Sequence, residues 1–184
     1  MNKKLLATLW IIAIILIMAG SGCGLLFSLN DNTADGLIAV TITRVVDGDT
    51  AYALLPDGKE EKIRFIGVDA PEINHPRVGL EPYGREADAF TREKLTDRKL
   101  WLEFDQGQHD QYDRMLAYLW LEIPDDYSDQ EIREKMFNAH LLLEGYATQV
   151  VFQPNVKYVD FFNRYQEEAK ASGKGLWSLE DEFK

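Results

Sequence analysis

The residues whose types could support catalysis gather in two short stretches, "VDGDT" at 46–50 and "RFIGVDAPE" at 64–72. Asp47 and Asp49 lie at the end of one predicted strand, and Asp69 and Glu72 follow another. Hard cations such as Ca²⁺ and Mg²⁺ prefer carboxylate oxygens, and loops at strand ends bring distant carboxylates together. Taken alone, "DGDT" is more typical of a turn than of a metal site, so both interpretations stay open at this point.

Arg64 stands inside an apolar strand, where an unpaired charge would be costly. It therefore needs a carboxylate or a phosphate partner. One interpretation is a structural ion pair with Asp69, and the other is a forked donor that faces a phosphate beside a metal. Regular alternation would put residues 64 and 69 on opposite faces, so we predict that the strand ladder breaks at Gly67.

A second arginine, Arg114, follows "HDQYD" at the start of another predicted strand, and by itself it favours a surface ion pair. Nucleophilic catalysis has little support. His75, His109 and His140 are scattered, and the sequence contains neither a GxSxG motif nor a glycine-rich phosphate loop. The carboxylates and the two arginines are therefore the main candidates for chemistry.

Short apolar runs and helical stripes predict the elements that must position these residues. Alternation and turn residues predict five strands, at 37–46, 50–55, 61–68, 99–105 and 114–123. Apolar spacing of three and four residues predicts three helices, at 81–97, 128–145 and 158–173. This order indicates an α+β fold in which a small closed five-stranded β-barrel carries three α-helices.

The chain has 184 residues, of which 46% are hydrophobic, so it can bury one core and is expected to form one domain. Without the two lysines of the leader, Lys3 and Lys4, the formal charge falls from −11 to −13, because the leader has no acidic residue. Such a charge is a poor match to a polyanion. Any handling of nucleic acid must therefore rest on a local site.

Residues 1–23 have the layout of an export signal, with a basic start, an apolar run and small residues before Cys23. Cys23 is the only cysteine, so an intrachain disulfide is excluded. Three interpretations remain, namely a lipoprotein signal with Cys23 as the lipidated residue, a plain cleaved signal, and an uncleaved membrane anchor. All three predict an extracytoplasmic protein, either secreted or held at the outer face of the membrane.

Several motifs, in order, resemble the staphylococcal nuclease (thermonuclease-like) family: "VDGDT", "RFIGVDAPE", "HPRVGLEPYGREADAFT", "FDQGQHDQYDRMLAY" and "KMFNAHLLLEGYA". The resemblance implies an OB-type barrel with three helices over residues 37–178, after a linker at 24–36 and before a tail at 179–184. It also implies a Ca²⁺-dependent endonuclease that hydrolyses phosphodiester bonds of DNA and RNA and leaves 3′-phosphate products. We expect a monomer, although the sequence leaves the oligomeric state open. Mg²⁺ or another divalent ion is the less favoured cofactor.

The resemblance assigns roles to several residues of the second stretch and to one of the first. Asp49 and Asp69 match the carboxylate metal ligands of the family, and the backbone carbonyl of Ala70 matches a third ligand. Threonine is usual at that last position, but a carbonyl ligand does not depend on the side chain. Glu72 falls at the position of the proposed general base, which orients or deprotonates the attacking water.

The same resemblance gives the two arginines a common task. Arg64 and Arg114 match the pair that grips the phosphate and stabilises the charge that develops on it. Tyr112 is retained as a candidate substrate contact. Gln111 and Asp113 replace a lysine and a glycine that are usual there, and we expect Asp113 to compete for Arg114 or to repel phosphate.

Two tyrosines that contact the nucleotide in the family stand here as Val150 and Phe152, which predicts weaker base stacking. The leading hypothesis is an exported nuclease. The alternative is a non-catalytic OB-fold module of the same family that binds a partner or nucleic acid. A structural ion-pair cluster without a ligand is the third, least favoured hypothesis, because it leaves the clustered negative charge unexplained.

Overall fold

The computed structural model describes residues 33–34, 36–73 and 79–181. The whole proposed leader, with Cys23, and most of the linker lie outside these ranges, as do His75 and the last three residues. A short strand, β1 (Thr33–Ala34), lies inside the range that we predicted as a linker, and it pairs with the first long strand. No helix in the described part of the chain is long and apolar enough to cross a membrane.

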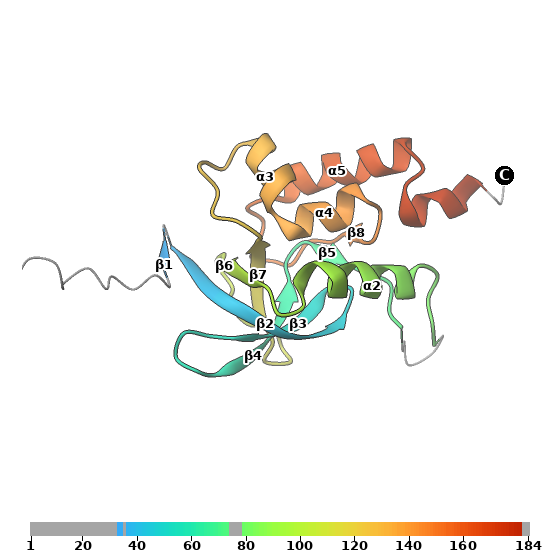
Figure 1. Cartoon of the computed structure of the whole chain (residues 1–184). Helices are drawn as coiled ribbons and strands as arrows, with labels where there is room; N and C mark the ends of the chain where they lie inside the picture. Colours follow the sequence, from blue (N-terminus) through green and yellow to red (C-terminus); the bar gives the residue numbers. More distant parts are fainter. Residues whose placement is uncertain (1–32, 35, 74–78, 182–184) are drawn as a thin grey trace, which may run out of the picture. The chain divides into compact units, whose positions relative to one another are not determined.

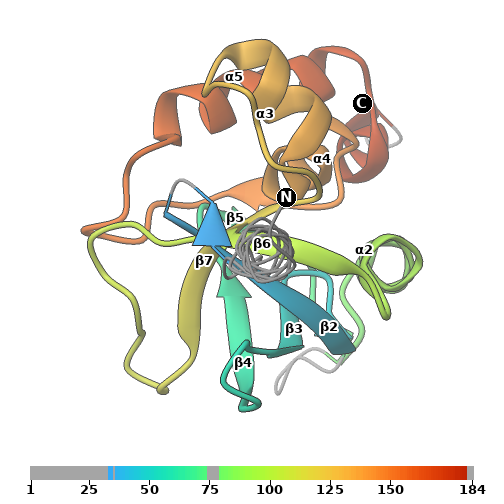
Figure 2. The same cartoon turned by 60° about the vertical axis from the view of Figure 1, so that its left-hand side comes forward.

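Five strands close into a barrel (Figures 1 and 2). They are β2 (Leu37–Asp47), β3 (Thr50–Leu54), β4 (Glu60–Phe65), β6 (Lys99–Glu103) and β7 (Met115–Trp120). The order is β2-β3-β4-β7-β6, and β6 returns to β2 to complete the ring. All pairings are antiparallel except that of β4 with β7. The structure therefore confirms the predicted five-stranded OB-type barrel.

The barrel core consists of the residues that point inward from alternate positions of each strand. Two helix side chains add to it at the end of β4, because the Phe137 ring of α4 contacts Phe65 and the Phe162 ring of α5 lies against Gly67. The fully buried members of this core include Ile42, Ala51, Ile63, Phe65, Leu102, Leu119, Phe137 and Phe162.

Four α-helices lie in the described residues, one more than predicted. They are α2 (Gly84–Leu95), α3 (Asp129–Lys135), α4 (Phe137–Leu143) and α5 (Val159–Ala171), followed by the 3₁₀-helix η1 (Gly175–Asp181). Figures 1 and 2 show α3, α4 and α5 together above the barrel, whereas α2 lies at its side and packs on β2.

The extra helix arises because the predicted helix at 128–145 is interrupted at Met136. This residue has an extended backbone (φ −94°, ψ 119°) and forms a β-bridge with Trp120 at the end of β7. Its side chain is fully buried. The apolar spacing that predicted one helix is the same on both sides of the break, so it did not reveal the interruption.

Asp129, the first residue of α3, joins α3 to α5. Its carboxylate accepts hydrogen bonds from Arg133 Nε at 2.8 Å, from Arg164 Nη2 at 3.0 Å and from the Tyr165 hydroxyl at 2.9 Å. Burial alone would raise the pKa of Asp129, but these hydrogen bonds together lower it below its usual value. The cluster therefore holds the acidic segment after β7 against the last long helix.

Candidate active site

The ladder of β4 breaks at Gly67, as predicted. Gly67 has φ +80°, and a Cβ there would lie 2.5 Å from the Phe162 ring, so both the conformation and the space require glycine. β4 ends at Phe65, and the chain then forms the two-residue strand β5 (Val68–Asp69), which pairs with β8 (Thr148–Gln149). This bend brings Asp69 back to the side of Arg64.

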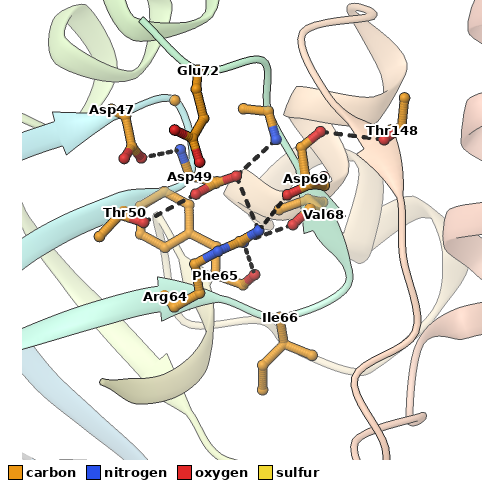
Figure 3. A network of polar contacts seen from close by, with 12 residues as sticks. Asp47, Asp49, Thr50, Arg64, Phe65, Ile66, Val68, Asp69, Glu72 and Thr148 are labelled. Atoms are coloured by element: carbon orange, nitrogen blue, oxygen red, sulfur yellow. Dashed lines mark hydrogen bonds and ion pairs between the residues drawn. The ribbon is translucent and has the colours of Figure 1, made fainter. Parts of the chain in front are cut away.

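Arg64 lies at the centre of the site with only 5% of its surface exposed (Figure 3). Its Nη1 donates to the carbonyl oxygens of Phe65 at 2.9 Å and Val68 at 2.7 Å. Its Nη2 contacts Asp69 Oδ1 at 2.8 Å and Asp49 Oδ2 at 3.1 Å. The guanidinium is therefore held by backbone and by two carboxylates, so the predicted pair with Asp69 is present and Asp49 is an additional partner.

Asp49 is buried beside Arg64. Its Oδ2 accepts a 2.7 Å hydrogen bond from the amide of Ala70, and its Oδ1 accepts one of 3.0 Å from the Thr50 hydroxyl. Burial, together with the charges of Asp47 and Asp69, raises the pKa of Asp49 to about 7, against the opposing effects of Arg64 and of the Ala70 amide. The site thus holds more negative charge than its arginine balances.

The loops that carry Asp49 and Ala70 approach each other closely at Gly48. A Cβ on Gly48 would lie 2.6 Å from the Ala70 Cβ, so a larger residue would force the loops apart. The glycine of "DGDT" is therefore required by this contact. Because the side chain of Ala70 is part of it, the alanine also suits this close packing.

The donor set fits a hard divalent cation. Asp49 and Asp69 both contact the same Arg64 nitrogen, so their oxygens lie near each other, and Ala70 adjoins them. Within the described residues no group of three histidine, cysteine, aspartate or glutamate side chains converges on one point. A cation held here would therefore need backbone or water oxygens besides the two carboxylates, which is ordinary for Ca²⁺.

Glu72 lies on the loop after β5, and Figure 3 shows its side chain directed toward Asp49. Two hydrogen bonds fix its backbone. The Glu72 amide donates to Glu81 Oε2 at 3.0 Å, and the Glu81 amide donates to the Glu72 carbonyl at 2.9 Å. Gly84 at the start of α2 allows this approach, since a Cβ there would lie 2.8 Å from the same carbonyl.

Sequence reasoning did not identify Glu81 as a site residue. The only signal was a carboxylate nine residues after the candidate base, close to the predicted start of a helix. The structure shows that Glu81 is hydrogen-bonded to the Glu72 backbone, so it holds that backbone in place.

Arg114 immediately precedes β7, the parallel neighbour of β4, in which Leu116 pairs with Arg64. The ion pair described for Arg114 is with Asp110, from Nε to Oδ2 at 2.7 Å, and not with the adjacent Asp113. Asp110 Oδ1 also accepts hydrogen bonds from the amides of Tyr112 and Arg114, so it shapes the whole turn. The structure describes no direct contact between Arg114 and the Arg64 cluster.

The remaining substrate-contact candidates lie on two segments. Tyr112 is 71% exposed, and its ring centroid is 5.5 Å from the Arg114 Cζ. The Val150 amide donates to the Gly67 carbonyl at 3.2 Å, which brings the segment after β8 to the site. Phe152 places its ring centroid 5.1 Å from the Arg64 Cζ, so an aromatic face is present at the buried arginine.

Comparison with known proteins agrees with this geometry. Residues 62–179 match the family model described as staphylococcal nuclease homologue. This chain belongs to that family. It is 39% identical over 137 residues to the thermonuclease of Staphylococcus hyicus, covering 74% of each chain. It is 38% identical to the thermonuclease of Staphylococcus intermedius over 136 residues, again 74% of each chain. It is also 38% identical to endonuclease YncB of Bacillus subtilis over 144 residues, which are 77% of this chain and 63% of the relative.

The family match covers most of the candidate site. Arg64, Asp69, Glu72 and Arg114 lie within it, whereas Asp49 lies upstream and is tied to the matched region by its contacts with Arg64 and Ala70. Asp113, which stands where the family usually has glycine, adopts the left-handed conformation with φ 60°. Its carboxylate is exposed beside the phosphate-binding candidate.

Proposed function

We propose that this member of the staphylococcal nuclease family is an exported, Ca²⁺-dependent endonuclease. Its substrates are DNA and RNA, and its products carry 3′-phosphates. The observation that carries the proposal is the buried Arg64 guanidinium, held by two carbonyls and two carboxylates at the bend of the chain. The names of the relatives, thermonuclease and endonuclease, support the same activity.

The side chains divide the work of phosphodiester hydrolysis. Arg64 and Arg114 donate hydrogen bonds to the non-bridging oxygens and stabilise the added negative charge as water attacks phosphorus. Glu72 accepts a proton from that water as the new P–O bond forms. The bond to the 5′ oxygen then breaks, the leaving oxygen takes up a proton, and the phosphate stays on the 3′ side.

Asp49, Asp69 and the Ala70 carbonyl would hold the Ca²⁺ ion. When bound, the ion supplies Lewis-acid polarisation of a phosphoryl oxygen. The protein's own contribution at this point is positional, because Gly48 and the Ala70 amide bring the two carboxylates onto one side of the barrel. The excess negative charge around Asp49 supports this assignment, since a cation would balance it.

The activity is tested on the full chain with labelled single-stranded DNA, duplex DNA and RNA, in Ca²⁺ or in a chelator. Glu72→Gln should lower kcat by at least about 10²-fold, the usual contribution of a general base. Arg64→Lys keeps the charge but loses the fork, and should lower kcat by roughly 10²- to 10³-fold. Glu86→Gln, an exposed carboxylate on α2, is the matched control and should retain full activity.

The outcomes separate the nuclease from its alternative. Loss of cleavage in chelator, and a change in product mobility after phosphatase treatment, are the expected results. Equal activity of wild type, Glu72→Gln and Arg64→Lys would refute the site assignment. Binding of DNA without any cleavage by wild type would instead support the non-catalytic OB-fold module.

Export and anchoring are part of the proposal and rest on the sequence of residues 1–23, and we further propose that the protein is a monomer. Mass spectrometry of membrane fractions should find Cys23 as the acylated first residue if the leader is of the lipoprotein type. An intact, unmodified leader would contradict lipidation, and a protein found only inside the cell would contradict export.

A further inference from the structure

Three residues form a row across neighbouring strands of the barrel. Arg44 of β2 pairs with Tyr52 of β3, and Tyr52 pairs with Lys62 of β4. The Arg44 Cζ lies 4.1 Å from the centroid of the Tyr52 ring, which is a cation–π contact. We call Arg44, Tyr52 and Lys62 the basic row.

The basic row lies on the same sheet face as the candidate active site. In the next outward-facing positions along β3 and β4, Thr50 pairs with Arg64. Two residues of a strand span about 7 Å, so the row lies one step from the buried guanidinium. Arg44 is exposed and Lys62 is half-buried, whereas Arg64 is buried. This face therefore leads from the site to solvent.

The two cations of the basic row have no carboxylate partner among the residues that the structure describes. Most arginines and lysines near the helices form ion pairs, such as Arg92 with Asp88 and Arg133 with Glu168. In the described part of the chain, neither cation of the row takes part in an ion pair. In a protein of formal charge −11, the row places two cations without a described ion-pair partner on either side of Tyr52.

Two carboxylates flank the row on the same face, and both already accept hydrogen bonds. Glu60, opposite Leu54, accepts from the Thr43 hydroxyl at 2.5 Å. Asp47, opposite Thr50, accepts from the Asp49 amide at 3.2 Å. Both carboxylates keep their negative charge, so the cations of the row attract an incoming phosphate against the repulsion of Glu60 and Asp47.

We propose that the basic row binds the backbone of single-stranded nucleic acid and leads it to the candidate active site. The proposal rests on the nuclease function proposed above and adds the path of the substrate beyond the cleaved bond. Arg44 and Lys62 contact phosphates, and the planar Arg44 guanidinium, stacked on the Tyr52 ring, provides the flat face on which an unpaired base stacks. An unpaired strand fits best, because its phosphate must bend inward to reach Arg64.

The test measures equilibrium binding of a fluorescent single-stranded 20-mer to the full chain in chelator, over a range of salt concentrations, so that cleavage does not interfere. The double variant Arg44→Gln with Lys62→Gln should reduce the slope of log K against log[salt] by about 1.4, since each phosphate contact of a single strand contributes about 0.7. Tyr52→Leu should weaken binding by at least about fivefold. Lys170→Gln with Lys174→Gln removes the same charge from the α5 side of the molecule and is the matched control.

A salt slope and affinity equal to those of the control variant would overturn the proposal. An equal loss for duplex and single-stranded DNA would also overturn it, because it would show that the row does not select an unpaired strand. Cleavage of a dinucleotide substrate in Ca²⁺ is measured separately. If wild type fails there, the nuclease function fails, while the binding data still decide the role of the row.

Discussion

Gly67 offers the sharpest test of how the chain builds the site. In the Gly67→Ala variant, the new side chain would be held at φ +80°, where an L-residue is strained by roughly 1–2 kcal/mol. Its Cβ would also lie 2.5 Å from the fully buried Phe162 ring, and such overpacking typically costs roughly 1–3 kcal/mol. We therefore expect the free energy of unfolding to fall by roughly 2–5 kcal/mol, a large part of a typical domain's stability.

Gly58→Ala is the matched control for this variant. Gly58 has φ +85°, and nothing lies within 4 Å of the position of its Cβ. The control should therefore lose only about 1–2 kcal/mol of strain. The difference between the two variants then measures the clash with Phe162 alone.

Urea unfolding of the wild type and of both variants, with Cm and m fitted together, gives these free energies. A cycle with Phe162→Leu isolates the clash, because Gly67→Ala in that background should show only the strain. The expected coupling is roughly 1–3 kcal/mol. If Gly67→Ala loses no more than Gly58→Ala, the argument that Phe162 and the bend jointly demand glycine is refuted. Nuclease activity should also fall only in the Gly67 variant, since the neighbouring Val68 carbonyl holds Arg64.

Three further predictions concern the groups that position the site and the helices. Glu81→Ala should lower kcat with little change in KM. Glu81→Gln keeps an acceptor for the Glu72 amide and should therefore retain activity. An equal loss in both variants would contradict a positioning role. Asp110→Ala should lower nuclease activity by releasing Arg114, while Asp113→Gly should preserve or raise that activity. If steady-state kinetics show a greater loss for Asp113→Gly than for Asp110→Ala, then Asp113 is the true partner of Arg114. Hydrogen bonds lower the pKa of Asp129, so the stability that its carboxylate contributes is complete above about pH 4 and is lost as pH falls through the folded-state pKa. The difference in unfolding free energy between wild type and Asp129→Asn should therefore shrink from pH 7 to pH 3 in urea titrations. A difference that stays constant with pH would refute the linkage.

Much of the fold could be predicted from the sequence because its signals are local. Alternation and turn residues placed the five barrel strands within a few residues of their observed bounds, and Gly67 marked the end of the β4 ladder. The break at Met136 was missed, because the buried stripe is the same in one helix or in two. Its cause is a bridge to Trp120, a contact between segments that the sequence does not show to be neighbours.

The types of the site residues were also evident from the sequence, but their partners were not. A buried arginine and clustered carboxylates already required compensation of charge. These partners depend on distances between segments that are far apart in the chain or lie across a turn. Such distances select Asp49 as a second partner of Arg64, Asp110 rather than Asp113 for Arg114, and Glu81 for Glu72.

By itself, then, the sequence determined which elements form, where the β4 ladder must bend and which residues could carry the chemistry. These features follow from propensity, periodicity and the conformation of glycine, which act over a few residues. Only the tertiary structure decided which charges meet, because strand register and loop approach set those distances. The basic row illustrates this division. Arg44 faces Tyr52 only because the register of β2 shifts between Ile42 and Arg44, and that shift exists only in the paired sheet.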